Sequence, residues 1–468
     1  MRFASDKPVM ALLPGDFATR PAASSLCEHI IRTLRLAGPV IVARCGLLIM
    51  VTVDTIMTGR AGANELAYLA IAFAPHITML VIGIGVLSGT VILVSQADGA
   101  GRRGSCGRIL WIALADAFVL GLLWAAVLFQ GEDILVLLGQ EADLSRGGSE
   151  VMAMFAWGMP AIYLFTAASM FLEGVGRVIP GMVVMLVANV INAALNWIFI
   201  YGGMGLEPDG ASGAVLATSL TRWFMFAAIF GYICLMADKA ELGIFRRVEG
   251  IWALQKRFLR LGVPMALSYA FETTAFLSIT IMAGHMGKAP VAAYQAAMNV
   301  NAFCFMVAIG MSTATSVRVG NAIGRRDRKG MAMAGWVGTG LIGAAMVPLA
   351  IIVALFPETL ACIYTTDATL IAIIIPALFV AVFLIPGDGL QGVLLGALRG
   401  AADVWPTTCL GFLAFWVIMV PMAWLLGREL GGGVPGLLWA EVIGIMTAAV
   451  LFAWRFRVIS QRKIAVFS

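Results

Sequence analysis

Residues 261–287, LGVPMALSYAFETTAFLSITIMAGHMG, decide the fold of this chain. The segment is apolar and long enough to cross a bilayer as a helix, because about 20 apolar residues span the hydrocarbon core. One carboxylate, Glu272, lies near its middle. Residues 36–62, LAGPVIVARCGLLIMVTVDTIMTGRAG, carry the same pattern 225 positions earlier, with an acid, Asp54, near the end. The chain therefore contains a duplicated membrane helix with a differently placed acid in each copy.

The duplication extends beyond this pair of segments. At the same shift, Val94 and Gly99 coincide with Val319 and Gly324. The other coincidences are Pro39 with Pro264, Thr55, Ile56 and Met57 with Thr280, Ile281 and Met282, Gly59 and Gly62 with Gly284 and Gly287, and, at a shift of 226, Leu172, Gly174 and Pro180 with Leu398, Gly400 and Pro406. Halves that repeat in this way and start on the same side of the membrane are parallel repeats, related by an axis along the membrane normal.

The composition is that of a membrane protein. Of the 468 residues, 61% are hydrophobic and 12% are charged, and the mean hydropathy is +0.95. Soluble domains carry about 25% charged residues. Only helices and closed barrels satisfy their backbone polar groups in lipid, and the long apolar runs exclude a barrel, whose strands alternate over about 10 residues. We therefore expect an all-α polytopic membrane protein.

The apolar runs predict twelve helices in two groups of six. Their expected spans are 36–58, 66–96, 108–130, 150–172, 178–201 and 211–236 in the first half, and 261–284, 291–321, 332–355, 370–396, 405–427 and 433–457 in the second. This divides the chain into a tail (1–35), a first lobe (36–236), a linker (237–260), a second lobe (261–457) and a final tail (458–468). The linker mixes aromatic, aliphatic and basic residues, which favours an amphipathic segment at the membrane surface.

Charges in the connections alternate between the two ends of the helices. Basic residues fill the N-terminal tail, the loops after the second, sixth and eighth helices and the final tail: Arg2, Lys7, Arg20, Arg32, Arg35, Arg102, Arg103, Lys239, Arg246, Arg247, Lys256, Arg257, Arg260, Arg325, Arg326, Arg328, Lys329, Arg455, Arg457, Arg462 and Lys463. The loop after the third helix is acidic instead. The positive-inside rule therefore predicts that both termini are cytoplasmic, which agrees with an even number of helices. Location in a membrane also accounts for the net charge of +5 without nucleic acid.

Two acids of the second half are expected at the same depth. Glu272 lies about 11 residues from the cytoplasmic end of its helix and Asp388 about nine, so both are roughly 13–17 Å deep. Charges inside the membrane are costly and usually functional. Two carboxylates in a low dielectric resist joint ionisation unless they share a cation or a proton. We predict an ion or proton site here; the alternative is two unrelated acids, each satisfied by neighbouring donors.

A second candidate site lies in the first half. Asp54 is about 18 residues into the first helix, and Asn192 and Asn196 are about 14 and 18 residues into the fifth helix. The two amides are one helical turn apart on one face. An acid with amide neighbours can bind a cation or take a proton. The alternative is that the asparagines only bond across helices to hold them together.

The remaining intramembrane charges are assigned structural or open roles. Arg44 and Asp116 share a depth of about eight residues from the cytoplasmic end and have opposite signs, which predicts a structural ion pair. Arg222 and Glu441 have no depth-matched partner, so their roles stay open. His76 is expected to be an ordinary interfacial residue.

Signatures of other classes of protein are weak in this sequence. The spacing of Gly83, Gly85 and Gly89 differs from a dinucleotide-binding fingerprint and falls within a membrane helix, where it favours close helix packing. The seven cysteines are scattered, with no spacing typical of a disulfide framework or a zinc site. We find no nucleophile–base pair, Walker motif or metal-ligand cluster, so no enzyme and no cofactor is predicted.

Several of these features together resemble the multidrug and toxic compound extrusion (MATE) transporters over nearly the whole chain, from about residue 36 to residue 457. The residues that carry the resemblance are Val53, Asp54 and Thr55 with Gly59 and Gly62; Asn192 and Asn196 followed by Trp197, Ile198 and Phe199; Pro264 with Glu272; the run Ser316, Val317, Arg318, Val319, Gly320 and Asn321; and Asp388 with Gln391, leading to Gly396, Ala397, Leu398, Arg399 and Gly400. An acid in the seventh helix with one in the tenth is similar to the NorM-like branch.

The resemblance implies a V-shaped fold of two lobes and a multidrug efflux antiporter that exports organic cations and amphipathic drugs. It implies that Glu272 and Asp388 bind the coupling ion, often Na⁺ in this branch, and that Asp54 with Asn192 and Asn196 forms a cation or proton site. It also implies an inner-membrane protein, with a monomer expected because the cavity needs no second copy. Arg60, where the family usually has a histidine, is a departure in the first half.

Two other functions remain open from the sequence. A flippase for a lipid or a lipid-linked saccharide would favour a strongly cationic central cavity, whereas the central charges here are mainly acidic. An integral-membrane enzyme would need a catalytic constellation. The physiological substrate, the choice between Na⁺ and H⁺, and the conformation are not fixed by the sequence.

Overall fold

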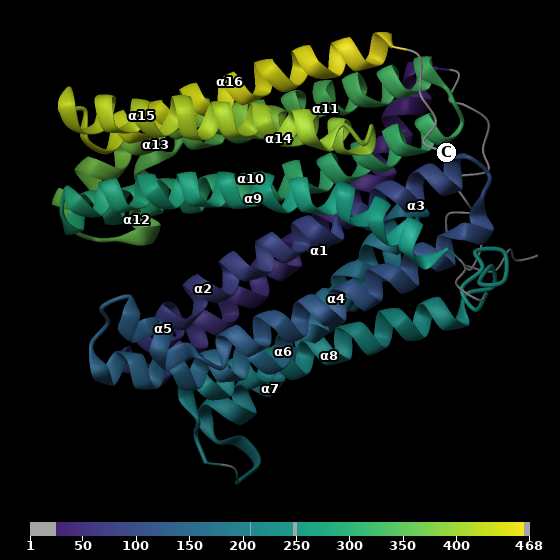
Figure 1. The fold of residues 1–468 in the computed structure, drawn as a ribbon. Coiled ribbons are helices and arrows are strands. Elements are labelled where there is room, and N and C mark those ends of the chain that lie inside the picture. Colours follow the sequence, from purple (N-terminus) through teal and green to yellow (C-terminus); the bar gives the residue numbers. More distant parts are fainter. Residues whose placement is uncertain (1–24, 206, 247–249, 463–468) are drawn as a thin grey trace, which may run out of the picture.

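The computed structural model describes residues 25–205, 207–246 and 250–462 (Figure 1). Most of the predicted N-terminal tail, residues 247–249 of the predicted linker and residues 463–468 of the predicted final tail lie outside this description, and so do the basic residues predicted there, Arg2, Lys7, Arg20, Arg247 and Lys463.

The described residues contain twelve helical spans that are long and apolar enough to cross a membrane, which confirms the predicted number. The first six are α1 (Leu26–Ala61), α2 (Ala63–Leu87) continued by α3 (Gly89–Gly99), α4 (Cys106–Leu128), α6 (Ala142–Gly174), α7 (Ile179–Tyr201) and α8 (Gly210–Leu235). The second six are α9 (Ile251–His285), α10 (Lys288–Gly324), α11 (Arg328–Leu355), α13 (Ala368–Gly400), the span 404–429 and α16 (Gly433–Gln461). Two short helices, α5 (Gly131–Leu137) and α12 (Pro357–Tyr364), lie in the connections.

Two spans begin ten residues earlier than predicted. Helix α1 starts at Leu26, where the Ser25 hydroxyl caps it by accepting a hydrogen bond from the backbone N–H of Glu28, and α9 starts at Ile251. Both extensions mix charged and apolar residues, so hydropathy does not register them. A side-chain cap favours the extra turns of α1, whereas Gly250 before α9 provides no side-chain cap. The predicted tail and linker are therefore partly helical.

The part of the linker before α9 forms turns that are fastened to α4. The backbone N–H of Gly107 donates to the carbonyl of Leu242 at 2.8 Å, and the indole Nε1 of Trp111 donates to the carbonyl of Ile244 at 2.7 Å. These described residues of the linker therefore pack on the first half of the chain. They form turns and not a continuous helix.

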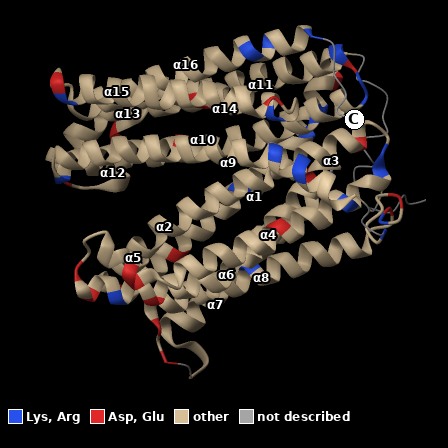
Figure 2. Cartoon of the chain, in the orientation of Figure 1, with Lys and Arg blue, Asp and Glu red and all other residues tan. Residues whose placement is uncertain are grey.

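The spans assemble into two lobes that converge at one end and diverge at the other, giving the expected V shape (Figure 1). The N-lobe contains α1–α8 and the C-lobe contains α9–α16. Lys and Arg are concentrated at the converging end, and Asp and Glu are more frequent at the open end (Figure 2).

Glycines bring the two lobes together at the converging end. A Cβ atom on Gly85 would lie 2.5 Å from the Cα of Ala266, and one on Gly99 would lie 2.3 Å from the carbonyl oxygen of Asn321. Such distances leave no room for a side chain, so the backbones of the two lobes touch directly here. We call these contacts, with their two counterparts described next, the glycine seam.

The glycine seam reproduces the internal repeat. A Cβ atom on Gly310 would lie 2.3 Å from the Ile41 side chain, and one on Gly324 would lie 2.3 Å from the carbonyl oxygen of Gln96. A shift of 225 positions converts the contact of Gly85 with Ala266 into that of Gly310 with Ile41. It likewise converts the contact of Gly99 with Asn321 into that of Gly324 with Gln96. The lobes therefore meet as parallel repeats, as predicted.

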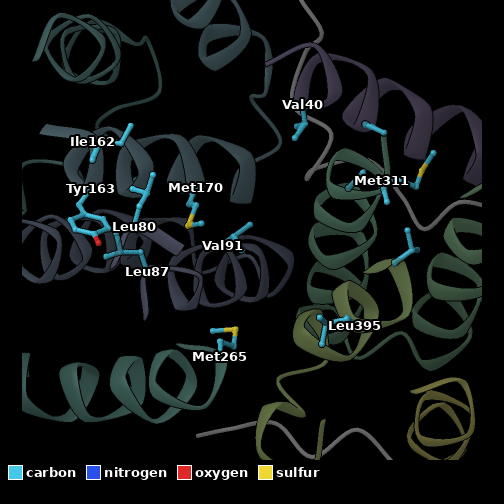
Figure 3. Packing of buried hydrophobic residues seen from close by; sticks show 14 of the residues in the cluster. Val40, Leu80, Leu87, Val91, Ile162, Tyr163, Met170, Met265, Met311 and Leu395 are labelled. Atoms are coloured by element: carbon cyan, nitrogen blue, oxygen red, sulfur yellow. The ribbon is translucent and has the colours of Figure 1, made fainter. Parts of the chain in front are cut away.

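The three glycines of α2 and α3 singled out in the sequence do permit close packing. Gly83 faces the ring of Tyr163, which is buried in α6. A Cβ atom added to Gly89 would lie 3.3 Å from the carbonyl oxygen of Phe258 in α9. Figure 3 shows Tyr163 among the buried side chains of the N-lobe, close to Leu80 and Leu87. The prediction that this motif serves packing is confirmed.

The eleventh span supports the helix that carries Glu272. It is interrupted by two π-helical stretches, Leu413–Met419 and Trp424–Glu429. From the first stretch, the indole Nε1 of Trp416 donates to the carbonyl of Phe271 at 3.0 Å. Earlier in the same span, the hydroxyl of Thr408 donates to the carbonyl of Pro264 at 2.8 Å. Both bonds fix the turns of α9 just before Glu272.

Candidate functional site

A cavity of about 440 Å³ lies between the two lobes. Its walls come from α1, α2, α3 and α6 of the N-lobe and from α9, α10 and α13 of the C-lobe. Most of the lining side chains are apolar; Val91, Met170, Met265 and Leu395, seen in Figure 3, are among them. The charged residues that line it are Arg44, Glu173, Glu272, Asp388 and Arg399. The cavity is thus an apolar chamber with three acids and two bases.

The structure brings Glu272 and Asp388 to this one cavity. Asp388 accepts a hydrogen bond from the amide nitrogen of Asn301 at 2.9 Å. Glycines on either side of it let neighbouring helices approach, since a Cβ on Gly389 would lie 2.6 Å from the Met346 side chain. In the described part of the chain neither acid forms an ion pair. The cavity therefore presents two carboxylates that have no ion-pair partner among the described residues.

Further oxygen and nitrogen atoms near the two acids also lack partners. The Oδ1 atom of Asn301 and both side-chain polar atoms of Gln391 are buried without a hydrogen bond among the described residues. Both residues line the cavity. Buried polar atoms are usually satisfied, so this group has spare capacity to coordinate a ligand.

Arg399 lies at one side of the same cavity, against Tyr269. Its Nη1 donates to the Tyr269 hydroxyl at 2.8 Å, and the guanidinium carbon lies 4.4 Å from the centre of the tyrosine ring. The Nε and Nη2 atoms are buried and unpartnered among the described residues. This base is therefore held in place by an aromatic ring rather than by a carboxylate.

The N-lobe brings together the second predicted group. Asp54 accepts hydrogen bonds from the amide of Asn196 at 2.6 Å and from the hydroxyl of Thr218 at 2.7 Å. Asn192 donates to Thr218 at 3.1 Å, and its oxygen accepts from Asn196 at 3.3 Å. The three helices α1, α7 and α8 thus meet at a closed network of neutral donors around one carboxylate.

Asp54 also lines a separate cavity of about 280 Å³ within the N-lobe, together with Arg222. Arg222 donates from Nη2 to His76 Nε2 at 3.0 Å. The His76 ring stacks on the Phe155 ring at 4.0 Å between centroids. The guanidinium carbon of Arg222 lies 5.6 Å from the centroid of the Phe155 ring. This cavity therefore holds one acid and one fixed base.

With this geometry described, comparison with known proteins identifies the family. The MatE family model matches residues 39–198 and 264–425, one match in each lobe. The chain belongs to the MATE family.

Curated MATE relatives match over almost their full length. A probable multidrug resistance protein NorM from Caulobacter vibrioides is 32% identical over 453 residues, which are 97% of this chain and 95% of the relative. The multidrug resistance protein NorM from Vibrio cholerae is 31% identical, over 90% of this chain and 94% of the relative. The resemblance to the NorM-like branch is thereby confirmed.

Solved MATE structures share the fold. The eukaryotic MATE transporter AtDTX14 superimposes with a TM-score of 0.85 over 93% of this chain and 98% of that chain, at 17% identity. A multidrug resistance MATE family transporter in an outward-facing conformation gives a TM-score of 0.86 over 98% and 100%, at 20% identity. The family match, the NorM relatives and the twelve spans together make this MATE protein a multi-pass membrane transporter and not an enzyme.

One predicted contact of this MATE protein is wrong. Arg44 does not pair with Asp116. Its Nη2 lies 3.5 Å from the carboxylate of Glu173, whereas Asp116 accepts two hydrogen bonds from the amide of Gln255, at 2.7 and 2.8 Å. Helix α1 packs against α7 and α10, and α4 packs against α6. Equal depth did not make the two helices neighbours.

The prediction for His76 is also wrong, because this residue is fully buried against Arg222 and Phe155. Sequence reasoning missed Thr218 and Asn301 as partners of the two acid sites. Asn301 had a weak sequence signal, since it is an amide within an apolar span, although Gln295 and Asn299 lie close to it in the sequence. Thr218 had none, since a threonine in a membrane helix usually bonds to its own backbone.

Proposed function

We propose that this MATE protein is a multidrug efflux antiporter that exports cationic and amphipathic organic compounds in exchange for Na⁺ or H⁺. The observation that carries the proposal is the pair Glu272 and Asp388, neither of which has an ion-pair partner among the described residues, in a large apolar cavity between two lobes. One pair of acids that attracts either an organic cation or a small cation gives the competition on which exchange depends. Caulobacter and Vibrio relatives that carry the name multidrug resistance protein support the same proposal.

The C-lobe acids are the proposed site of the transported coupling ion. Hard cations are bound by carboxylate and carbonyl oxygens. Besides Glu272 and Asp388, the unpartnered oxygens of Asn301 and Gln391 are available in the same cavity. This oxygen set suits Na⁺ as well as a proton. In the described residues no group of three or more His, Cys, Asp and Glu side chains gathers as for a tightly held metal, which is consistent with an ion that must also leave.

Asp54 with Asn192 and Asn196 is the proposed N-lobe site for a cation or a proton. Thr218 joins this group as a direct donor to Asp54. Each of the two oxygens of Asp54 already accepts a hydrogen bond, although the Asn196 oxygen is buried without a partner among the described residues. Arg222 lines the same cavity. We assign this site to a proton in preference to Na⁺, because an incoming metal ion would have to displace bonds to Asp54 and approach a fixed positive charge.

We propose that both termini are cytoplasmic, that the membrane is the inner membrane and that the protein acts as a monomer. The concentration of Lys and Arg at the converging end (Figure 2) supports the orientation through the positive-inside rule. In this orientation the V opens to the outside of the cell. The central cavity is enclosed by the two lobes of one chain, so no second copy is needed.

The wall of the cavity supports a broad range of substrates. Flexible methionine and aromatic side chains adapt to apolar ligands of different shapes. They include Met170, Met265, Met298, Met306, Phe276 and Phe305. The excess of acids over bases favours ligands with positive charge.

The experiment is efflux of a fluorescent organic cation from proteoliposomes, with a Na⁺ gradient and a proton gradient imposed separately. Efflux under either gradient, lost in Glu272→Gln and Asp388→Asn, supports antiport. Asp116→Asn is the matched control, since Asp116 is an acid within a membrane span that lies outside both sites. Full efflux by both substituted proteins contradicts the assignment of the coupling site.

A flippase for a lipid or a lipid-linked saccharide is the alternative. It would need a cationic cavity for phosphate groups, and here Arg44 is paired with Glu173, which leaves Arg399 as the cavity base without a carboxylate partner among the described residues. Lipid translocation without solute efflux under either gradient would favour this alternative.

A further inference from the structure

Glu441 lies in the core of the C-lobe, outside the central cavity and outside the sites described so far. It belongs to α16 and is completely buried. Its Oε1 accepts a hydrogen bond from the hydroxyl of Tyr294 in α10 at 2.5 Å. Its Oε2 is buried with no hydrogen-bond partner among the described residues. One neutral donor is thus all that this acid receives from the described chain.

The internal repeat places Glu441 at the position of Thr218. A shift of 223 positions aligns the start of α8, GASGAVLAT, with the start of α16, GVPGLLWAE. Gly210, Gly213 and Ala217 then coincide with Gly433, Gly436 and Ala440, and Thr218 coincides with Glu441. In the N-lobe, Thr218 is a direct hydrogen-bond donor to Asp54.

The partner of Glu441 also has a counterpart at the N-lobe site. At the shift of 225, Tyr294 coincides with Leu69, which lines the N-lobe cavity beside Asp54. The position of Asp54 itself is taken in the C-lobe by Ile279, a buried apolar residue. The two lobes therefore each have a carboxyl at the same place in the fold, supplied by α1 in one lobe and by α16 in the other.

We propose that Glu441 and Tyr294 form a proton-binding site of the C-lobe, the counterpart of the Asp54 site. An ionised carboxylate in apolar surroundings is costly unless it is paired and hydrogen-bonded. Among the described residues, the titratable groups that act on Glu441 are Tyr294 and the acid Asp388 of α13, and no Lys, Arg or His lies within ion-pair distance of it. A bound proton removes the charge at no steric cost.

A metal ion fits this site less well than a proton. Hard cations take several oxygen ligands, about six or more for the larger ones. Glu441 and the hydroxyl of Tyr294, with the nearby Thr280 side chain, offer too few. The C-lobe then has two kinds of site: an open one at Glu272 and Asp388 that can take Na⁺, and an enclosed one at Glu441 that takes H⁺.

Infrared difference spectroscopy of the purified protein tests the site without any transport. The carbonyl stretch of a carboxylic acid should be present in the wild-type protein and missing in Glu441→Gln at neutral pH. Glutamine has the shape of the protonated acid, so folding should be preserved. In Tyr294→Phe the band should persist but move to higher frequency, because the carbonyl loses its hydrogen bond. Spectra of Glu441→Gln that match the wild type, or an unmoved band in Tyr294→Phe, overturn the proposal; should Glu441→Gln not fold, Tyr294→Phe still decides.

A second experiment asks whether the proton takes part in coupling, and this step rests on the proposed antiport function. In proteoliposomes, Glu441→Gln should lower efflux driven by a proton gradient several-fold more than efflux driven by a Na⁺ gradient. Equal effects on both would make Glu441 a permanently protonated structural residue and overturn the coupling role. If the wild-type protein moves no dye under either gradient, the proposed antiport function is wrong. The infrared experiment still tests proton binding at Glu441, because it does not depend on transport.

Discussion

Asp54 in the N-lobe accepts hydrogen bonds from Asn196 and Thr218, whereas Glu272 in the C-lobe accepts none from the described residues. The N-lobe cavity contains the fixed base Arg222 and measures about 280 Å³. The central cavity bordered by Glu272 and Asp388 measures about 440 Å³ and has unpartnered oxygens in its wall. The N-lobe acid is already saturated, while the C-lobe acids have unused coordination.

This difference shows that a duplicated fold does not imply duplicated chemistry. Saturated acids exchange small ligands such as protons, because no bond to the protein need be replaced by a larger ion. Unsaturated acids can exchange a metal ion for an organic cation. Five substitutions test this contrast, and they are given in decreasing order of expected effect.

The largest effect is expected from neutralising the open site. Glu272→Gln and Asp388→Asn should each reduce gradient-driven efflux by about 100-fold. This is the effect expected when a coupling free energy at the upper end of the usual range is lost completely. The measurement is the initial rate of dye efflux at matched protein levels. Near wild-type rates in both variants would remove the C-lobe from the coupling mechanism.

A smaller effect, which depends on the driving ion, is expected at the saturated site. Asp54→Asn retains one oxygen for Asn196 or Thr218 but cannot release a proton, so proton-driven efflux should fall by about tenfold and Na⁺-driven efflux by less. The ratio of the two rates is the quantity to measure. Equal losses under both gradients would show that the two lobes do not divide the ions between them.

Replacing Arg222, the fixed base of the N-lobe cavity, should have a still smaller effect, on the Na⁺ dependence of efflux. Arg222→Gln removes the positive charge beside Asp54 and keeps a donor for His76, so Na⁺ should compete for the N-lobe and lower the half-saturating Na⁺ concentration by about fivefold. The assay is efflux rate against Na⁺ concentration. An unchanged or higher half-saturating concentration would exclude Arg222 as the residue that keeps Na⁺ away.

The smallest effect is expected from an acid outside both sites. Asp116→Asn keeps an oxygen for the Gln255 amide, so efflux should change by less than about threefold, within the free energy of one ordinary hydrogen bond. Thermal unfolding should confirm an intact fold. A loss as large as that of Glu272→Gln would mean that any intramembrane acid is indispensable, and the contrast between the lobes would lose its meaning.

Much of the fold was predictable because hydropathy, repeated motifs and charge in the loops are local properties of the chain. The twelve spans, the repeat and the packing role of Gly83 and Gly85 follow from such patterns. The polar start of α1 does not, because Ser25 caps a helix that hydropathy cannot detect.

The candidate sites were predictable only in part. Asn192 and Asn196 share a helix face, so their contact with Asp54 could be predicted by assuming only that the first and fifth helices are neighbours. Arg44 and Asp116 were matched by depth alone, which ignores the direction in which each side chain points and which helices touch. His76 meets Arg222 across 146 positions of sequence, a pairing that no local pattern reports.

The glycine seam has a consequence for the role of the linker. Because the shift of 225 positions exchanges its contacts, each six-helix half presents both the glycine and the surface that receives it. Such an interface is self-complementary, like that of a two-fold homodimer. Each six-helix half therefore carries all the features that define this interface, so the linker is not required to specify how the two halves meet.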